Sequence, residues 1–104
     1  MILTTTEQIP GHDIVEVVGL VQGTSVRASD ISADVGSFMQ NIVGGEIERY
    51  TKLMAEVREQ CLDRMREEAR ARGADAIVGV RFVSSEISRG AAELVVYGTA
   101  VRLA

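Results

Sequence analysis

Two candidate metal ligands occur once each in this 104-residue chain, the histidine His12 and the cysteine Cys61. His12 lies in a turn-like sequence beside the carboxylate of Asp13, and imidazole, carboxylate and thiolate groups all bind divalent metals. Cys61 falls among apolar residues at helical spacing, where a cysteine usually packs as a small hydrophobic residue. Each residue therefore has two interpretations. His12 is a metal ligand or a solvated turn residue, and Cys61 is a metal ligand shared between copies of the chain or a core residue.

A second candidate site surrounds a pair of glycines. Free backbone N–H groups at a helix start attract anions, and carboxylates nearby could hold a hard cation. The residues that we predict to bind a ligand here are Asp34, Gly44, Gly45, Glu46 and Tyr50. The competing interpretation is structural, because an acidic residue at position 46 already stabilises the positive end of a helix dipole.

The familiar catalytic motifs are absent from the sequence. It contains no HExxH, CxxC, GxSxG or GxxxxGK[ST] pattern, so zinc protease, dithiol, serine hydrolase and P-loop chemistry lack the residues that they need. The net charge of -4 and the isoelectric point near 4.9 argue against binding of nucleic acid or an anionic membrane. We predict no catalysis, no nucleic-acid partner and no membrane partner.

The composition is that of one globular domain over residues 1–104. The chain is 46% hydrophobic and 25% charged, with one proline, and its length suffices for a single core. The first residues do not resemble a secretory signal, and no stretch approaches the ~20 apolar residues that span a bilayer. One cysteine forms no intramolecular disulfide. We therefore expect a cytoplasmic protein.

The elements that would position these residues begin with two strands. Residues 14–27 are rich in β-branched side chains, which favours a strand, and Gly19 and Gly23 within it indicate a bulge or a close approach of another backbone. A short strand is predicted at 2–4, and the only proline, Pro10, marks the turn between the two.

Two helices are expected to follow. Apolar residues at three- and four-residue spacing predict a helix over 31–43, which ends at the glycine pair. A second helix is predicted over 46–72, with an apolar stripe that includes Cys61 and a balanced charged surface elsewhere. Oppositely charged residues four apart, such as Glu68 and Arg72, support it.

A hairpin closes the chain, with strands predicted at 75–87 and 91–103 and a tight turn at 88–90. In the first strand, one face is predicted to carry Ala76, Val78, Val80 and Phe82, and the other Ile77, Gly79 and Val83. In the second strand, Leu94 and Val96 are predicted to oppose Val95, Tyr97, Val101 and Leu103. Both faces of this hairpin are apolar.

These elements predict an α+β fold, a small antiparallel sheet with two helices on one face. An antiparallel sheet with water on its other face should alternate apolar with polar residues, and this hairpin does not. Monomeric proteins rarely expose an apolar patch of several hundred Å². We therefore expect a homo-oligomer in which sheets meet between subunits.

Several local motifs together resemble the YbjQ-like family of small bacterial and archaeal proteins, which are described as heavy-metal-binding. The motifs are Ile14-Val15-Glu16 with Gly19, Ile42-Val43-Gly44-Gly45, Tyr50, Ala69-Arg70, Gly73-Ala74-Asp75-Ala76-Ile77-Val78-Gly79 and Gly98-Thr99-Ala100-Val101. The resemblance covers nearly the whole chain. It implies a dodecin-like β-α-β-β core, a ring-shaped oligomer that is typically a pentamer, and a divalent metal ion as a candidate cofactor.

The chain departs from the family pattern at four positions. Glu46 stands where a basic residue often follows the glycines, and Thr51 where an acid often follows the tyrosine. Arg81 and Val83 stand at strand positions that are commonly acidic in the family. A metal role that depends on acids at those two positions is therefore not available to this chain.

The function expected from these observations is that of a small homo-oligomer that binds a metal ion or a small ligand at its subunit interfaces. Two alternatives stay open. One is a structural adaptor that docks a protein partner through the charged surface of the long helix. The other is an enzyme with an inter-subunit site around Gly44-Gly45, formed by Asp34, Glu46 and Tyr50.

Overall fold

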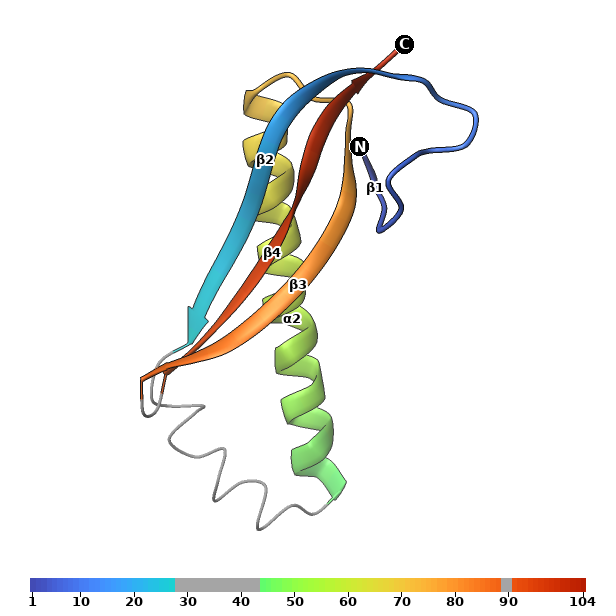
Figure 1. Cartoon of the computed structure of the whole chain (residues 1–104). Coiled ribbons are helices and arrows are strands. Elements are labelled where there is room, and N and C mark those ends of the chain that lie inside the picture. Colours follow the sequence, from blue (N-terminus) through green and yellow to red (C-terminus); the bar gives the residue numbers. More distant parts are fainter. Residues whose placement is uncertain (28–43, 89–90) are drawn as a thin grey trace.

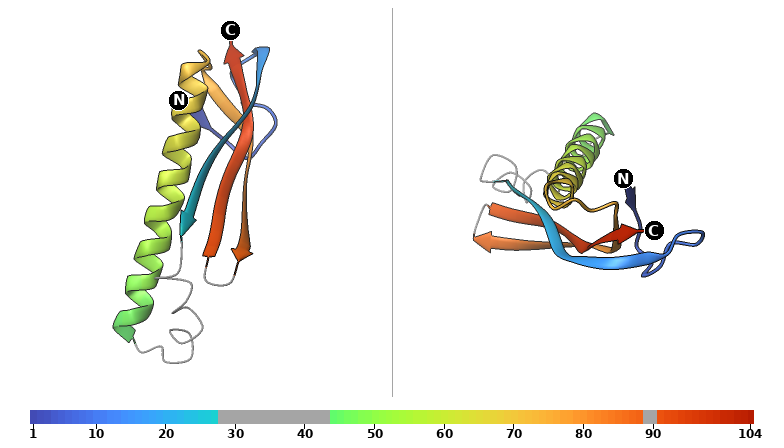
Figure 2. Two further views of the ribbon diagram at one scale, coloured as in Figure 1. Left: turned by 90° about the vertical axis from the view of Figure 1, so that its left-hand side faces the viewer. Right: turned by 90° about the horizontal axis from the view of Figure 1, so that it is seen from above.

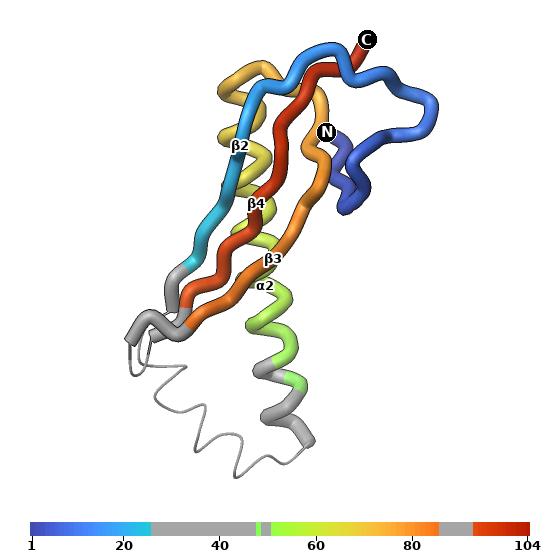
Figure 3. The backbone as a smooth tube through the Cα atoms, in the orientation of Figure 1, coloured from blue at the N-terminus to red at the C-terminus, as the bar shows by residue number. Residues whose placement is uncertain are grey.

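The computed structural model describes residues 1–27, 44–88 and 91–104 and has a small α+β fold (Figure 1). Its elements are strand β1 (Ile2–Leu3), strand β2 (Ile14–Arg27), helix α2 (Gly44–Ala71), strand β3 (Ala76–Ser88) and strand β4 (Ala91–Leu103). The strands form one sheet in the order β1-β3-β4-β2. The three long strands lie side by side along their length (Figure 3), and α2 covers one face of the sheet (Figure 2).

The predicted bounds of the elements agree closely with the structure. The strands expected at 14–27 and 91–103 have those bounds, and the strands expected at 2–4 and 75–87 differ by one residue at their ends. Helix α2 begins two residues earlier than expected, so the glycine pair forms its first turn. The helix expected at 31–43 and the turn residues 89 and 90 lie outside the described residues.

The prediction of a wholly antiparallel sheet is wrong, because β1 pairs with β3 in parallel, Ile2 opposite Ala76 and Leu3 opposite Ile77. The other two pairings, β2 with β4 and β3 with β4, are antiparallel. Residues 4–13 carry the chain from β1 at one edge of the sheet to β2 at the opposite edge (Figure 1). A strand of two residues has too weak a pattern to show which neighbour it joins, so the sheet is mixed.

The core between α2 and the sheet contains one row of the helix and the helix-facing residues of three strands. The helix contributes a buried residue at every fourth position, which is the spacing of one helix face. The buried members of this core are Val21, Val57, Cys61, Met65, Ala69, Ile77, Val80, Val96 and Ala100. Gly23 brings the two layers together, since a Cβ atom at this position would lie 1.9 Å from the Cys61 carbonyl oxygen. The expected close backbone approach at Gly23 is therefore confirmed.

A bulge at Gly79 corrects the predicted faces of β3. Val78 lies opposite Thr99, but Arg81 lies opposite Tyr97, so β3 has one extra residue here, and Gly79 adopts a φ of 61°, which glycine tolerates without steric cost. The extra residue moves Val80 to the helix side, with Ile77, while Val78 stays on the other side. The assignment of Val78, Val80 and Phe82 to one face is therefore wrong. The predicted faces of β4 are confirmed.

Candidate functional site

The face of the sheet that α2 does not cover is called the outer face here, and it carries the exposed apolar residues of interest. Residues that pair across antiparallel strands share a face, so the register defines rows across β2, β4 and β3. The rows are Val17, Val101 and Ala76; Leu20, Thr99 and Val78; Gln22, Tyr97 and Arg81; and Thr24, Val95 and Val83. Apolar side chains from all three strands are thus neighbours on this face.

Four residues of the outer face form what we call the outer apolar patch: Val17, Leu20, Val83 and Tyr97. Val17 and Leu20 on β2 are 66% and 63% exposed, and Val83 on β3 and Tyr97 on β4 are 51% and 39% exposed. Large apolar residues exposed singly are ordinary, whereas these four share one face of the sheet. The expectation that the second face of the sheet is apolar is confirmed.

The chain covers one end of the outer face with its own N-terminal segment, residues 4–13. Ile9 packs there against Ala76, Val78 and Val101, and Ile14 and Leu103 flank this small cluster. Backbone hydrogen bonds join the segment to β3, from the Thr4 amide to the Ile77 carbonyl (3.0 Å), from Gly79 to Thr6 (2.9 Å) and from Val80 to Thr4 (3.0 Å). The outer apolar patch is therefore the part of the face that this segment leaves uncovered.

Arg81 fixes the border between the covered and uncovered parts. Its Nη1 atom donates to the carbonyl oxygens of Thr5, at 2.9 Å, and Val80, at 2.8 Å. A depression of about 420 Å³ lies at this border, where Glu7 and Arg81 face Val17, Thr99 and neighbouring apolar residues. Arg81 thus ties the N-terminal segment to the sheet.

The predicted metal ligands lie in separate places. His12 is exposed in the N-terminal segment, its backbone N–H donates to the Ile9 carbonyl (3.0 Å), and it lines a hollow of about 750 Å³ with Glu7 and Asp13. Cys61 is fully buried beneath the sheet, where its Sγ atom donates to the Leu94 carbonyl oxygen at 3.4 Å. Within residues 1–27, 44–88 and 91–104, no three His, Cys, Asp or Glu side chains gather as a metal site requires.

The predicted ligand-binding set lies at the other end of the molecule. Gly44, Gly45, Glu46 and Tyr50 belong to the first two turns of α2, and Asp34 lies outside the described residues. Helix α2 begins at the end of the sheet opposite the N-terminal segment (Figure 1). The structure therefore does not bring this set together with His12 or Cys61 in one chain.

One polar arrangement was not foreseen from the sequence, although its signal is present. Arg64, Glu68 and Arg72 each follow a core residue of α2 by three positions, and residues three apart are neighbours on a helix surface. The expected pair of Glu68 and Arg72 is confirmed, with Arg72 Nη2 3.7 Å from Glu68 Oε1. All three side chains contact the backbone of β2.

Comparison with known proteins decides the family. The sequence profile of the YbjQ family, described as "Putative heavy-metal-binding", matches residues 1–104. The chain belongs to the YbjQ family. Three relatives carry the name UPF0145 protein, which states no enzymatic activity. The relative from Archaeoglobus fulgidus is 50% identical over 99% of this chain and 95% of its own. The relative from Clostridium perfringens is 50% identical over 97% and 95%, and that from Halobacterium salinarum is 46% identical over the whole of both chains.

A solved structure supports the fold. A protein of unknown function of the DUF74 family from Pediococcus pentosaceus superposes with a TM-score of 0.66 over 100% of this chain and 98% of its own, at 16% sequence identity. At that identity the similarity shows the fold of this YbjQ-family chain. In the part of the chain that the structure describes, no helix is long and apolar enough to cross a lipid bilayer.

Proposed function

We propose that this protein acts as a homo-oligomeric ring, a pentamer, whose subunits bury the outer apolar patch and bind a metal ion or a small ligand at their interfaces without catalysing a reaction. The outer apolar patch carries the proposal. Burying its four side chains between subunits would remove apolar surface from water, which stabilises the assembly by about 25 cal/mol per Å². Within the described residues, no element of the same chain buries these side chains, since each is 39% or more exposed.

The metal part of the proposal draws on the family description, "Putative heavy-metal-binding". A heavy-metal ion does not fit the described residues of a single chain, since these hold no group of three donors. More than one subunit would have to contribute a ligand, and His12 is an exposed donor that could take part. Cys61 would join such a site only after α2 had separated from the sheet, because its side chain is fully buried.

Native mass spectrometry of protein purified without chelator or affinity-tag metal tests both parts. We expect one assembly with five times the 11.2 kDa mass of the chain. The variant Leu20→Glu should give monomers with an unchanged circular dichroism spectrum, because a side chain 63% exposed in the monomer can carry a charge there but not in a buried interface. The control Gln8→Glu adds the same charge on the exposed N-terminal segment and should assemble normally.

The outcomes separate cleanly. A wild-type monomer of 11.2 kDa at micromolar concentration would refute the oligomer. An assembly that Leu20→Glu leaves intact would show that another surface joins the subunits. Addition of Zn²⁺ or Ni²⁺ should add a fixed mass per assembly, reduced in His12→Ala, and an assembly that gains no mass would remove the metal from the proposal.

A further inference from the structure

Within the described residues, one edge of the sheet has no further strand beside it. Strand β2 forms one whole edge, and an edge strand presents unpaired N–H and C=O groups to which another chain can add a strand. This strand is 14 residues long, and Glu16 and Arg27 are its only charged residues. Its β-branched sequence suits strand addition, because long edges with few charges are the ones that recruit further strands.

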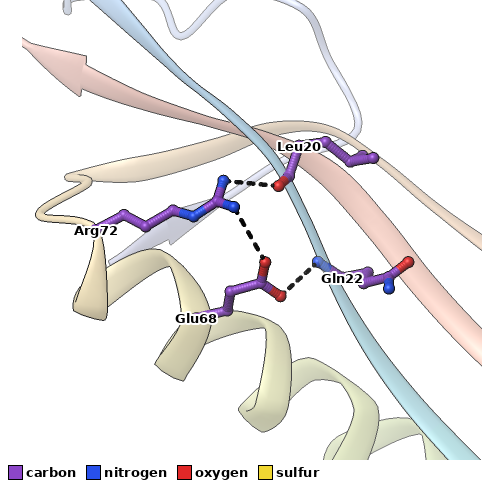
Figure 4. Close-up of polar contacts among 4 residues, drawn as sticks. All are labelled: Leu20, Gln22, Glu68 and Arg72. Carbon is purple, nitrogen blue, oxygen red and sulfur yellow. Dashed lines mark hydrogen bonds and ion pairs between the residues drawn. The ribbon is translucent and has the colours of Figure 1, made fainter.

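Three side chains from one face of α2, those of Arg64, Glu68 and Arg72, occupy this edge. Figure 4 shows the contacts of Glu68 and Arg72 with the strand. Arg72 Nη1 donates to the Leu20 carbonyl oxygen at 2.9 Å. The Gln22 amide donates to Glu68 Oε2 at 3.2 Å, and Arg64 Nη1 donates to the Thr24 carbonyl oxygen. Every second residue of β2 from Leu20 to Thr24 thus has an outward backbone group bonded to the helix.

The spacing of this polar row, Arg64, Glu68 and Arg72, matches the spacing of the strand. Four residues of a helix rise about 6 Å, and two residues of a strand rise about 6.8 Å. The charges match as well, since a cationic donor meets each carbonyl group and an anionic acceptor meets the amide. The ion pair between Arg72 and Glu68 links neighbouring members of the row.

We propose that the polar row closes the β2 edge against strand addition by a second copy of this chain, so that copies associate through the outer apolar patch and not by extending the sheet. A strand added at β2 would have to displace the bonds to Leu20, Gln22 and Thr24 before forming its own. The inference rests on the proposed function in one respect, that copies of the chain meet; the closure itself is a property of the single chain.

The test compares two triple variants of the full chain with the same change in charge. Arg64→Ala/Glu68→Ala/Arg72→Ala removes the polar row. Arg58→Ala/Glu67→Ala/Arg70→Ala also removes two arginines and one glutamate, from exposed positions of α2 whose side chains form no hydrogen bond or ion pair with β2 in the described structure. By light scattering and thioflavin T fluorescence, the first variant should form assemblies whose mass grows with concentration, and the second should keep the wild-type mass. Equal masses for the two variants would overturn the proposal.

Single variants decide the question if the first triple variant does not fold. Hydrogen exchange at the Gln22 amide should accelerate about tenfold in Glu68→Ala, the equivalent of ~1.4 kcal/mol. It should stay near the wild-type rate in Glu68→Gln, which retains an oxygen acceptor. Unchanged exchange in Glu68→Ala would overturn the proposal. A wild-type protein that proves monomeric would refute the proposed ring, whereas the comparison of variants would still decide whether the polar row closes the edge.

Discussion

At Gly23 the absence of a side chain lets α2 lie directly on β2, and this contact explains the state of Cys61. The missing Cβ atom is the reason that the Cys61 carbonyl oxygen can lie so close to the strand. The Cys61 thiol is thereby held against the Leu94 carbonyl oxygen of β4. A thiol enclosed in this way reacts as a core residue unless the helix and the sheet separate.

We predict that the Cys61 thiol is inert in the native protein. A thiol-specific chromogenic reagent should label it only as fast as the protein unfolds, and fully in urea, because the side chain has no exposed surface. The variant Gln8→Cys in a Cys61→Ser background, with its thiol on the exposed N-terminal segment, should react within the mixing time. Rapid labelling of native Cys61 would mean that α2 opens readily and that the thiol is available to a metal.

At the scale of elements, the N-terminal segment covers one end of the outer face, and Arg81 holds it there through the Thr5 carbonyl oxygen. We predict that Arg81→Ala loosens this segment, since it removes two charge-assisted bonds to carbonyl groups. Exchange of the Gly79 and Val80 amides, which donate to the segment, should rise roughly tenfold, whereas exchange of amides between β2 and β4 should not change.

The matched control for this prediction is Arg66→Ala, which removes an arginine that pairs with Asp63 on the same helix and forms no hydrogen bond or ion pair with a strand in the described residues. It should leave exchange at Gly79 and Val80 at the wild-type rate. If Arg81→Ala behaves like Arg66→Ala, the backbone hydrogen bonds and Ile9 alone hold the segment, and Arg81 has no part in defining the border of the patch.

The same scale shows what the sequence could and could not predict. Periodicity located β2, α2, β3 and β4 because each has a long pattern of apolar residues, and the apolar character of both sheet faces followed from the hairpin. It failed at Gly79, where one extra residue inverts the alternation with no local signal beyond the glycine. It also failed at β1, whose pairing with β3 is continued by backbone hydrogen bonds that no pattern encodes: the Thr4 amide donates to Ile77, and the Thr6 carbonyl accepts from Gly79.

The candidate site could be predicted less well than the fold. The binding residues were predicted from the chemistry of their side chains and not from their positions in space. In the structure, His12, Cys61 and the start of α2 lie in three different parts of the molecule. The polar row was not predicted, because Arg64, Glu68 and Arg72 belong to a helix surface whose balanced charges are typical of a solvated face. Side chains that form hydrogen bonds with a backbone far away in the sequence can be recognised only once the order of the strands is known.

For the whole molecule, burial of the outer apolar patch between copies would couple stability to association. We predict that the melting temperature of the wild-type protein rises with concentration. For a pentamer, each tenfold increase adds about 1 kcal/mol per chain, or roughly 4–8 °C for a domain of this size. Leu20→Glu should melt at one temperature throughout. A wild-type melting temperature that does not change over a hundredfold range of concentration would contradict assembly through this patch.

The bulge at Gly79 also constrains how the gene can change. Residues before it and after it keep opposite alternations, so Ile77 and Val80 both reach the core although they are three positions apart. An insertion or deletion of one residue between Ile77 and Phe82 would exchange core and outer residues along one side of the change. In this part of β3, the number of residues is therefore constrained independently of which side chains they carry.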